Sequence, residues 1–252
     1  MCIMAMAWNA HPRWRLVLIG NRDEYHARPA APIARWTDRP GVIAGRDLQS
    51  GGTWLGVSDA GRAAIVTNVR GYGPPQPDRA SRGALVSDLL AGDDAYADGT
   101  APGDFNPFNL IWIDGPSAHF LTNRPAPLRI ALTPGVYGLS NGALDTPWPK
   151  TLALKGALLA WLTSGQHQPE HLFDALRTET LPDAGIAPTT PSDAPDEAAA
   201  SPIFIRNPLY GTRCSSIIMV DADGQGMIRE RRFDPDGAPS GEDTIGFDWR
   251  GY

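Results

Sequence analysis

The second residue of the chain, Cys2, carries the side chain best suited to nucleophilic chemistry. Initiator methionine is commonly removed when the next residue is small, and its removal would leave a thiol and a free α-amine on Cys2. An α-amine with a pKa of about 8 can accept the proton of a thiol with a pKa of about 8.5, so one residue would supply both base and nucleophile. The alternative is an inert cysteine at the start of a buried strand, and taken alone Cys2 favours that alternative.

Five further polar residues stand where an apolar run begins or ends. They are Arg22, Asp23, Asn68, Asn141 and Arg213. Each has an ordinary explanation, because asparagine favours turns and arginine favours surfaces. Together they fit the needs of a cysteine nucleophile, which requires a cation to stabilise the thiolate and amide donors to stabilise a tetrahedral oxyanion. We therefore predict that these five residues converge on Cys2 as the catalytic site.

Arg22 and Asp23 are adjacent, which limits how they can act together. Successive side chains on a strand point to opposite faces, so both reach one site only if the chain turns or bulges there. For Glu24 we expect a structural ion pair with Arg22 that closes the hairpin. We expect Cys214 to be inert core, since it begins an apolar run.

The elements that must position these residues are mostly short strands. Apolar runs predict strands at residues 2–8, 16–21, 42–45, 53–58, 63–68, 108–113, 118–123, 129–132, 136–140, 214–221, 227–233 and 244–249. Tight turns such as Asp59-Ala60-Gly61 link most of them, so most pairing should be antiparallel. Leucine spacing predicts helices at 82–91 and 149–163, with a shorter one at 171–178.

These elements predict an α+β fold, a four-layer αββα sandwich of two antiparallel sheets, since each apolar sheet face needs a covering layer. An open fold with a single sheet is the alternative. We expect one domain over residues 1–252, with a flexible loop at about 181–202, where proline, alanine, aspartate and threonine dominate.

Composition narrows the classes of function. The net charge is −6 with no basic block, which argues against a nucleic-acid partner. No apolar run reaches the ~18–20 residues of a membrane span, and there is no signal-peptide pattern, so we expect a cytoplasmic protein. The histidines show no metal spacing, and we expect no metal and no other cofactor. The sequence leaves the oligomeric state open.

A set of ordered motifs runs through nearly the whole chain. They are Met1-Cys2, Asn21-Arg22-Asp23-Glu24, Gly45-Arg46-Asp47, Gly51-Gly52-Thr53-Trp54-Leu55-Gly56, Thr67-Asn68, Ser81-Arg82-Gly83, Phe108-Asn109-Leu110, Leu139-Ser140-Asn141 and Tyr210-Gly211-Thr212-Arg213. The set resembles the NRDE family, also called transport-and-Golgi-organisation-2 homologues. The layout of that family in turn resembles cysteine N-terminal-nucleophile (Ntn) hydrolases of the choloylglycine hydrolase and acid ceramidase type.

That resemblance implies an αββα sandwich, an N-terminal cysteine and cleavage of amide carbon–nitrogen bonds. Position by position, Cys2 matches the nucleophile. Arg22 and Asp23 match the residues that hold the nucleophile and its amine, although in those enzymes intervening residues separate the two. Asn68 matches the oxyanion side of the site. Asn141 and Arg213 match the later asparagine and arginine of the pocket.

Two classes of function follow from these observations. The first is an amidohydrolase or acyltransferase that acts on a small acyl-amide or lipid-like substrate through a Cys2 thioester, once Met1 is removed. The second is a non-catalytic protein that binds or carries a hydrophobic small molecule, such as a lipid, an acyl-CoA or a haem-like ligand. Retention of Met1 would favour the second, because a blocked Cys2 amine cannot act as a base.

Overall fold

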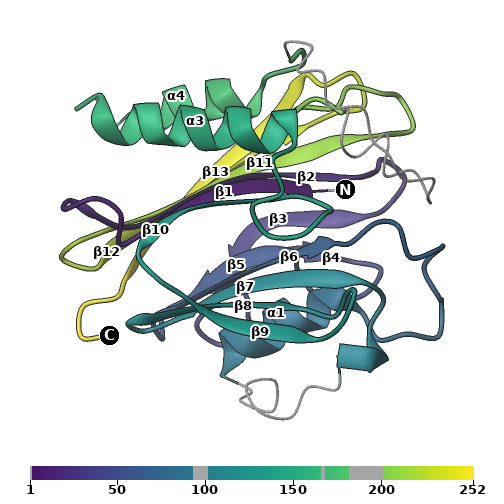
Figure 1. Cartoon of the computed structure of the whole chain (residues 1–252), viewed down its shortest axis with the longest axis horizontal. Coiled ribbons are helices and arrows are strands. Elements are labelled where there is room, and N and C mark those ends of the chain that lie inside the picture. The colour runs from purple at the N-terminus through teal and green to yellow at the C-terminus, as the bar shows by residue number, and fades with distance from the viewer. Residues whose placement is uncertain (1, 93–101, 166–167, 182–200) are drawn as a thin grey trace.

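The computed structural model describes residues 2–92, 102–165, 168–181 and 201–252. Two antiparallel sheets form its centre (Figure 1). Sheet A contains, in spatial order, β10 (Gly135–Leu139), β1 (Cys2–Trp8), β2 (Trp14–Tyr25), β11 (Tyr210–Asp221), β12 (Gln225–Phe233) and β13 (Pro239–Asp248). Sheet B contains β3 (Ala30–Arg35), β4 (Val42–Asp47), β5 (Leu55–Ser58), β6 (Arg62–Asn68), β7 (Phe108–Asp114), β8 (Ser117–Thr122) and β9 (Leu128–Leu132).

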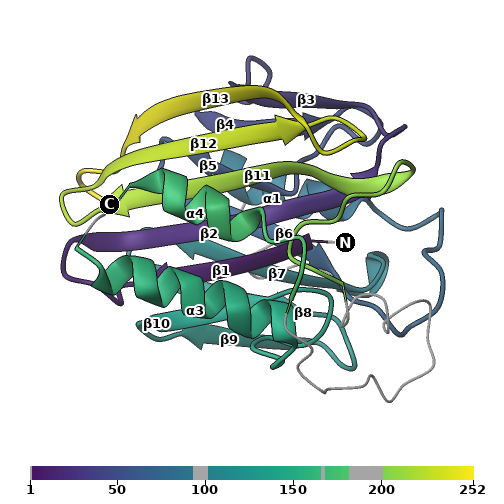
Figure 2. The same cartoon turned by 90° about the horizontal axis from the view of Figure 1, so that it is seen from above.

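Helices cover the outer face of each sheet. The helices α3 (Pro149–Thr163) and α4 (Pro169–Leu176) lie side by side over sheet A, as Figure 2 shows from above. On the far side, α1 (Arg82–Ala91) packs against β4, β5, β6 and β7 of sheet B. A short 3₁₀ helix, η1 (Pro102–Asp104), precedes β7. The order helix, sheet, sheet, helix confirms the predicted αββα sandwich.

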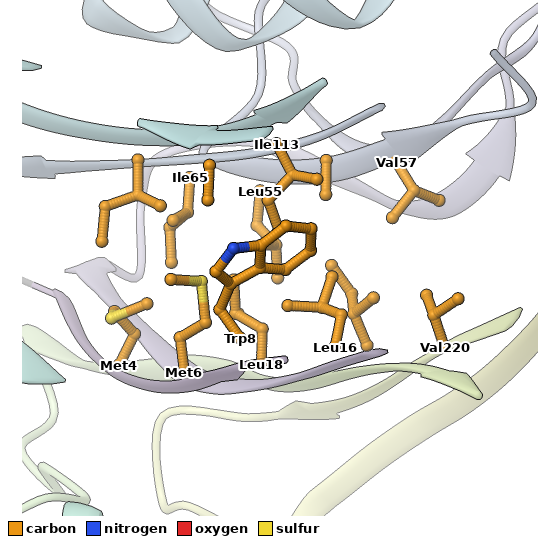
Figure 3. Close-up of a cluster of buried hydrophobic side chains, with 14 of the residues drawn as sticks. Met4, Met6, Trp8, Leu16, Leu18, Leu55, Val57, Ile65, Ile113 and Val220 are labelled. Atoms are coloured by element: carbon orange, nitrogen blue, oxygen red, sulfur yellow. The ribbon is translucent and has the colours of Figure 1, made fainter. Parts of the chain in front are cut away.

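Side chains alternate between the two faces of each strand, so the residues of one strand pack into two different hydrophobic cores. In β1, Met4, Met6 and Trp8 face sheet B, whereas Ile3, Ala5 and Ala7 face α3 and α4. Figure 3 shows Met4, Met6 and Trp8 packed against Leu55, Ile65 and Ile113 from the opposite sheet. Both faces of β1 are buried, so the chain that carries Cys2 is held firmly from its third residue onward.

The structure differs from the sequence-based expectation in one strand and in the bounds of some elements. The edge strand β3 was not predicted, and β2 continues beyond residue 21 as far as Tyr25. The helix expected at 171–178 spans Pro169–Leu176 instead. The loop expected at about 181–202 falls mostly on residues 182–200, which lie outside the described residues. In the part of the chain that the structure describes, no helix has the length and apolar character needed to cross a membrane.

Candidate active site

Cys2 opens onto a cavity of about 500 Å³ at the end of sheet A where β1 begins. The cavity is also lined by the end of β2, by the loop that follows β4 and by the segment that leads into α1. Of the predicted site residues, five line it: Cys2, Arg22, Asp23, Asn68 and Arg213. Asn141 does not line the cavity and is fully buried. The fold therefore brings residues from four distant parts of the sequence to one place.

Arg22 stands between two cysteines on the same face of sheet A. It is paired directly with Cys2 on β1 and with Cys214 on β11, and directly opposed residues in a sheet project to the same side. That side faces sheet B. Leu16 and Leu18, which lie an even number of residues from Arg22 on β2 and so share its face, pack in the core between the sheets. The Arg22 guanidinium lies 4.0 Å from Glu24 and 3.8 Å from Asp47. The expected Arg22–Glu24 ion pair is thus present, and Arg22 is placed to stabilise a thiolate on Cys2.

Asp23 points to the opposite face of β2, as strand alternation requires. Its carboxylate accepts a 2.6 Å hydrogen bond from the Thr212 hydroxyl and is almost completely buried. Burial raises the pKa of Asp23 to about 6, although Thr212 and the nearby Lys150 and Arg22 act to lower it. The chain does not bulge at Asp23, so Arg22 and Asp23 reach the Cys2 region from opposite sides of the strand end.

The surroundings of Cys2 contain one buried lysine that the sequence did not single out. Lys150, at the start of α3, is 1% exposed and donates a 2.8 Å hydrogen bond to Ser201. Burial lowers the pKa of Lys150 to about 8, while Asp23 and Cys2 act to raise it. A lysine within an apolar run of a helix gives no sequence signal of this kind, because only the tertiary fold brings its charge close enough to affect Asp23.

The surroundings of Cys2 raise the pKa of its thiol. Burial raises its pKa and the charge of Asp23 adds to this, whereas Arg22 and a backbone hydrogen bond from Asp23 lower it. The main chain of Cys2 is fixed as well, because the Ser140 hydroxyl donates a 2.9 Å hydrogen bond to its carbonyl oxygen. Attack by this sulfur therefore requires a base that removes the thiol proton.

Asn141 acts on the site through its neighbours. Its side-chain amide donates a 2.9 Å hydrogen bond to the Asn68 carbonyl, and its own carbonyl accepts one from the Arg70 backbone N–H. Its side-chain oxygen lies 3.3 Å from the Ser140 hydroxyl oxygen. Asn141 thus joins the strand end that carries Asn68 to the residue that holds Cys2, and it does not line the cavity.

Arg213 sits at a bulge in β11. Thr212 pairs with Asp23 and Cys214 pairs with Arg22, which leaves Arg213 as the extra residue. Bulges re-aim a side chain, and here the Arg213 guanidinium turns to the β2–β3 connection, where it donates 2.9 Å hydrogen bonds to the carbonyls of Tyr25 and Arg28. It lies at the rim of the cavity.

Cys214 is buried and faces an acidic partner. Burial raises its pKa well above the usual value, and Glu230, which hydrogen-bonds the thiol, raises it further. Both cysteines are free thiols. Within the described residues, no group of three or more His, Cys, Asp and Glu side chains is arranged to hold a metal ion.

The family model for transport and Golgi organisation 2 matches residues 1–235 of the chain. The chain belongs to this family. It is 35% identical to the human Transport and Golgi organization protein 2 homolog, with 92% of each chain covered. It is 26% identical to Transport and Golgi organization protein 2 of Drosophila melanogaster, with 89% of each covered. These names state no chemical activity.

Solved structures of two hydrolases are similar in arrangement. One is a Caenorhabditis elegans orthologue of N-acylethanolamine-hydrolyzing acid amidase, with a TM-score of 0.47 and 14% identity, covering 86% of this chain and 92% of that one. The other is a mutant conjugated bile acid hydrolase from Clostridium perfringens, with a TM-score of 0.47 and 7% identity, covering 98% and 97%. At these TM-scores neither likeness bears on the activity of this family member.

Proposed function

We propose that the chain is an N-terminal-nucleophile cysteine amidohydrolase or acyltransferase that cleaves the carbon–nitrogen bond of a small acylated amide after Met1 is removed. The observation that carries the proposal is the placement of Cys2. It is the first residue of a strand buried on both faces, its side chain opens onto a cavity, and Arg22 lies beside it on the same face. A nucleophile fixed at the edge of a cavity next to a cation suits acyl transfer.

In the first half-reaction the α-amine of Cys2 takes the thiol proton, directly or through water. The thiolate attacks the acyl carbon and forms a tetrahedral oxyanion, which the Asn68 side chain and a backbone N–H stabilise. Arg22 stabilises the thiolate, and the Asp23 carboxylate holds the α-ammonium. The carbon–nitrogen bond then breaks, the leaving amine takes the proton from the α-ammonium, and a thioester remains on Cys2.

In the second half-reaction water or another amine attacks the thioester, and the α-amine accepts the proton of that attacking group. The carbon–sulfur bond breaks, the thiol recovers a proton, and a carboxylic acid or a new amide leaves. Burial raises the pKa of Asp23 to about 6, and the Thr212 hydroxyl and the charge of Lys150 partly offset that rise, which favours the carboxylate at neutral pH. Asn141 and Ser140 keep Asn68 and Cys2 in place through the hydrogen bonds described above.

A specific observation favours the non-catalytic alternative, in which the cavity only binds a ligand. The pKa of the Cys2 thiol is raised by burial, whereas reactive cysteines are typically those whose pKa is lowered by their surroundings. The two functions differ in one requirement. Catalysis needs the free α-amine of Cys2 as a base, whereas binding does not.

The decisive experiment combines the intact mass of the protein with a screen of acyl-amides. The protein is produced with its native terminus, and the same chain with an uncleaved N-terminal tag serves as the blocked form. We expect loss of Met1, turnover of at least one acyl-amide, and a mass increase equal to the acyl group on Cys2. Cys2→Ala and the tagged form should both be inactive, whereas Cys214→Ala should keep its activity.

Retained Met1, or equal turnover by Cys2→Ala, would overturn the catalytic proposal. If the untagged protein binds the amides without turning any over, the ligand-binding function takes its place.

A further inference from the structure

The cavity beside Cys2 is positively charged although the chain as a whole is negative. Among the described residues, seven arginines and four acidic residues line it. The arginines are Arg22, Arg28, Arg46, Arg79, Arg82, Arg213 and Arg232, and the acids are Asp23, Glu24, Asp47 and Glu230. Arg46 and Arg232 are paired with Asp38 and Asp243, which lie outside the lining, so the positive charge that can attract an anionic ligand comes mainly from the other arginines.

The carboxylates of the cavity are already engaged. Asp47 lies 2.7 Å from the Arg28 guanidinium, and Glu24 lies 4.0 Å from both Arg22 and Arg28. Glu230 accepts hydrogen bonds from the Ile33 backbone N–H and from Arg232. Asp23 points to the other face of β2 and is bonded to Thr212. None of these acids lies within 4.0 Å of Arg79 or Arg82, the arginines on the opposite wall of the cavity.

The opposite wall of the cavity is formed by Arg79 and by Arg82, the first residue of α1. In the described part of the chain, neither has a carboxylate within 4.0 Å. Arg82 donates a 3.1 Å hydrogen bond to the Pro107 carbonyl, and Arg79 donates to Gln76 and to the Gly103 carbonyl. Each guanidinium has five N–H groups, so several remain for a ligand.

Arg82 is the arginine of the opposite wall whose charge is coupled to that of Cys2. Burial lowers its pKa to about 10, so it keeps its charge at neutral pH, and the charge of Cys2 raises that pKa. This coupling places the Arg82 charge within electrostatic range of Cys2. A partly desolvated guanidinium without a protein carboxylate gains most from a bidentate anion.

We propose that Arg82 and Arg79 bind an anionic group, a carboxylate or a phosphate, on the amide that occupies this cavity. The inference deepens the proposed function, on which it rests for the amide. Trp54, Val66 and Phe233 supply an apolar part of the lining, so the ligand combines a short acyl chain with the charged group. A cavity of about 500 Å³ accommodates a molecule of that size.

Binding of three matched amides to the Cys2→Ala variant tests the inference without turnover. The probes are N-hexanoylethanolamine, which is neutral, N-hexanoyl-O-phosphoethanolamine and N-hexanoylglycine, all measured by titration calorimetry. We expect at least one anionic probe to bind about 10-fold to 100-fold more tightly than the neutral amide, as charge-assisted hydrogen bonds predict. The phosphate and carboxylate probes identify which anion the site prefers.

Substitution then assigns the preference to these side chains. Adding Arg82→Gln should reduce the advantage of the anion to less than about threefold, and Arg79→Gln should reduce it in part. Arg82→Lys should retain some of it. The matched control is Arg46→Gln, since Arg46 also lines the cavity but is held by two bonds to Asp38, of 2.8 and 2.6 Å. That control should leave the preference unchanged.

Equal binding of neutral and anionic probes by a folded Cys2→Ala protein would overturn the inference, as would an equal loss with Arg46→Gln. If the anions bind selectively but the wild-type protein cleaves no amide, the anion site stands and the catalytic proposal fails. If an amide is cleaved and the neutral probe binds as well as the anionic ones, the catalytic proposal stands and the anion site fails.

Discussion

The Ser140 hydroxyl holds the Cys2 main chain, although the two residues are 138 positions apart. The ladder between β1 and β10 ends at the pair Met4–Leu139, so beyond it the Cys2 carbonyl needs another donor. The Ser140 side chain supplies that donor and also contacts Asn141. The start of β1 is therefore fixed by a side chain where the backbone pairing stops.

Removal of the Ser140 hydroxyl should loosen the site and the fold together. We expect Ser140→Ala to lower the free energy of unfolding by about 1–3 kcal/mol, because it leaves the buried partners of the hydroxyl unsatisfied. Urea unfolding measures this. Ser117→Ala is the control, since Ser117 is exposed on β8 and the change should stay within about 0.5 kcal/mol. Equal effects of the two substitutions would contradict the anchoring role of Ser140.

The two thiols should differ strongly in reactivity. Cys2 is partly exposed to the cavity, whereas Cys214 is 6% exposed and its pKa is raised well above normal by burial and by Glu230. With iodoacetamide at pH 8 we expect Cys2 to be alkylated at least about ten times faster than Cys214. Peptide mass spectrometry over a time course measures both rates.

The variant Cys214→Ala serves as the control for this selectivity, and Cys2 in this variant should be alkylated at the wild-type rate. Faster labelling of Cys214 than of Cys2 would show that the cavity does not expose the Cys2 thiol as described.

The layers of the fold were predictable from sequence because its long strands and helices have clear periodicity. The strand β1 was predicted with its bounds intact, since both of its faces are apolar. The edge strand β3 was missed because its sequence, Ala-Ala-Pro-Ile-Ala-Arg, contains a proline and small residues, and one side chain in it is buried. Edge strands carry a weak pattern because only part of their surface is covered.

The sequence pointed to residues that line the cavity, but it did not show how they are arranged there. Strand alternation correctly set Arg22 and Asp23 on opposite faces, but only the pairing of β2 with β11 shows that Asp23 meets Thr212. The bulge at Arg213 has no sequence signal, because it depends on the register of two strands almost 190 residues apart. The burial of Lys150 was missed because it depends on how α3 packs in the folded chain, which the sequence does not show.

The buried Asp23 should make stability depend on pH. Burial raises its pKa from 3.8 to about 6, so between these values the folded state binds more protons than the unfolded one. The stability that protonated Asp23 contributes is therefore fully present below pH 3.8 and is lost as the pH rises through 6. Relative to Asp23→Asn, wild type should lose about 3 kcal/mol of unfolding free energy between pH 3.5 and pH 7.

Urea unfolding of both proteins at intervals across that range measures the difference. Asparagine keeps an oxygen for the Thr212 hydroxyl, so the comparison isolates the ionisation of Asp23. A difference that stays constant with pH would show that Asp23 titrates normally in the folded state.

Glycine at position 52 should be required for the wall that carries Arg82. A Cβ atom on Gly52 would lie 2.5 Å from the carbonyl carbon of Gly83 and 2.6 Å from its oxygen, both backbone atoms that cannot turn away. The Thr53 N–H donates a 3.2 Å hydrogen bond to that same oxygen, so the clash would push the start of α1 outward. We expect Gly52→Ala to lower the free energy of unfolding by about 1–3 kcal/mol and to weaken binding of the anionic probes.

Gly156→Ala is the matched control for this substitution. Gly156 lies within α3, and no atom is within 4 Å of the Cβ that alanine would add. Alanine there should raise the free energy of unfolding by about 0.5–1 kcal/mol, because it restricts the unfolded chain and favours the helix. Thermal and urea unfolding of the two variants should therefore move in opposite directions. A Gly52→Ala protein with wild-type stability would mean that α1 can move away from the cavity wall without loss.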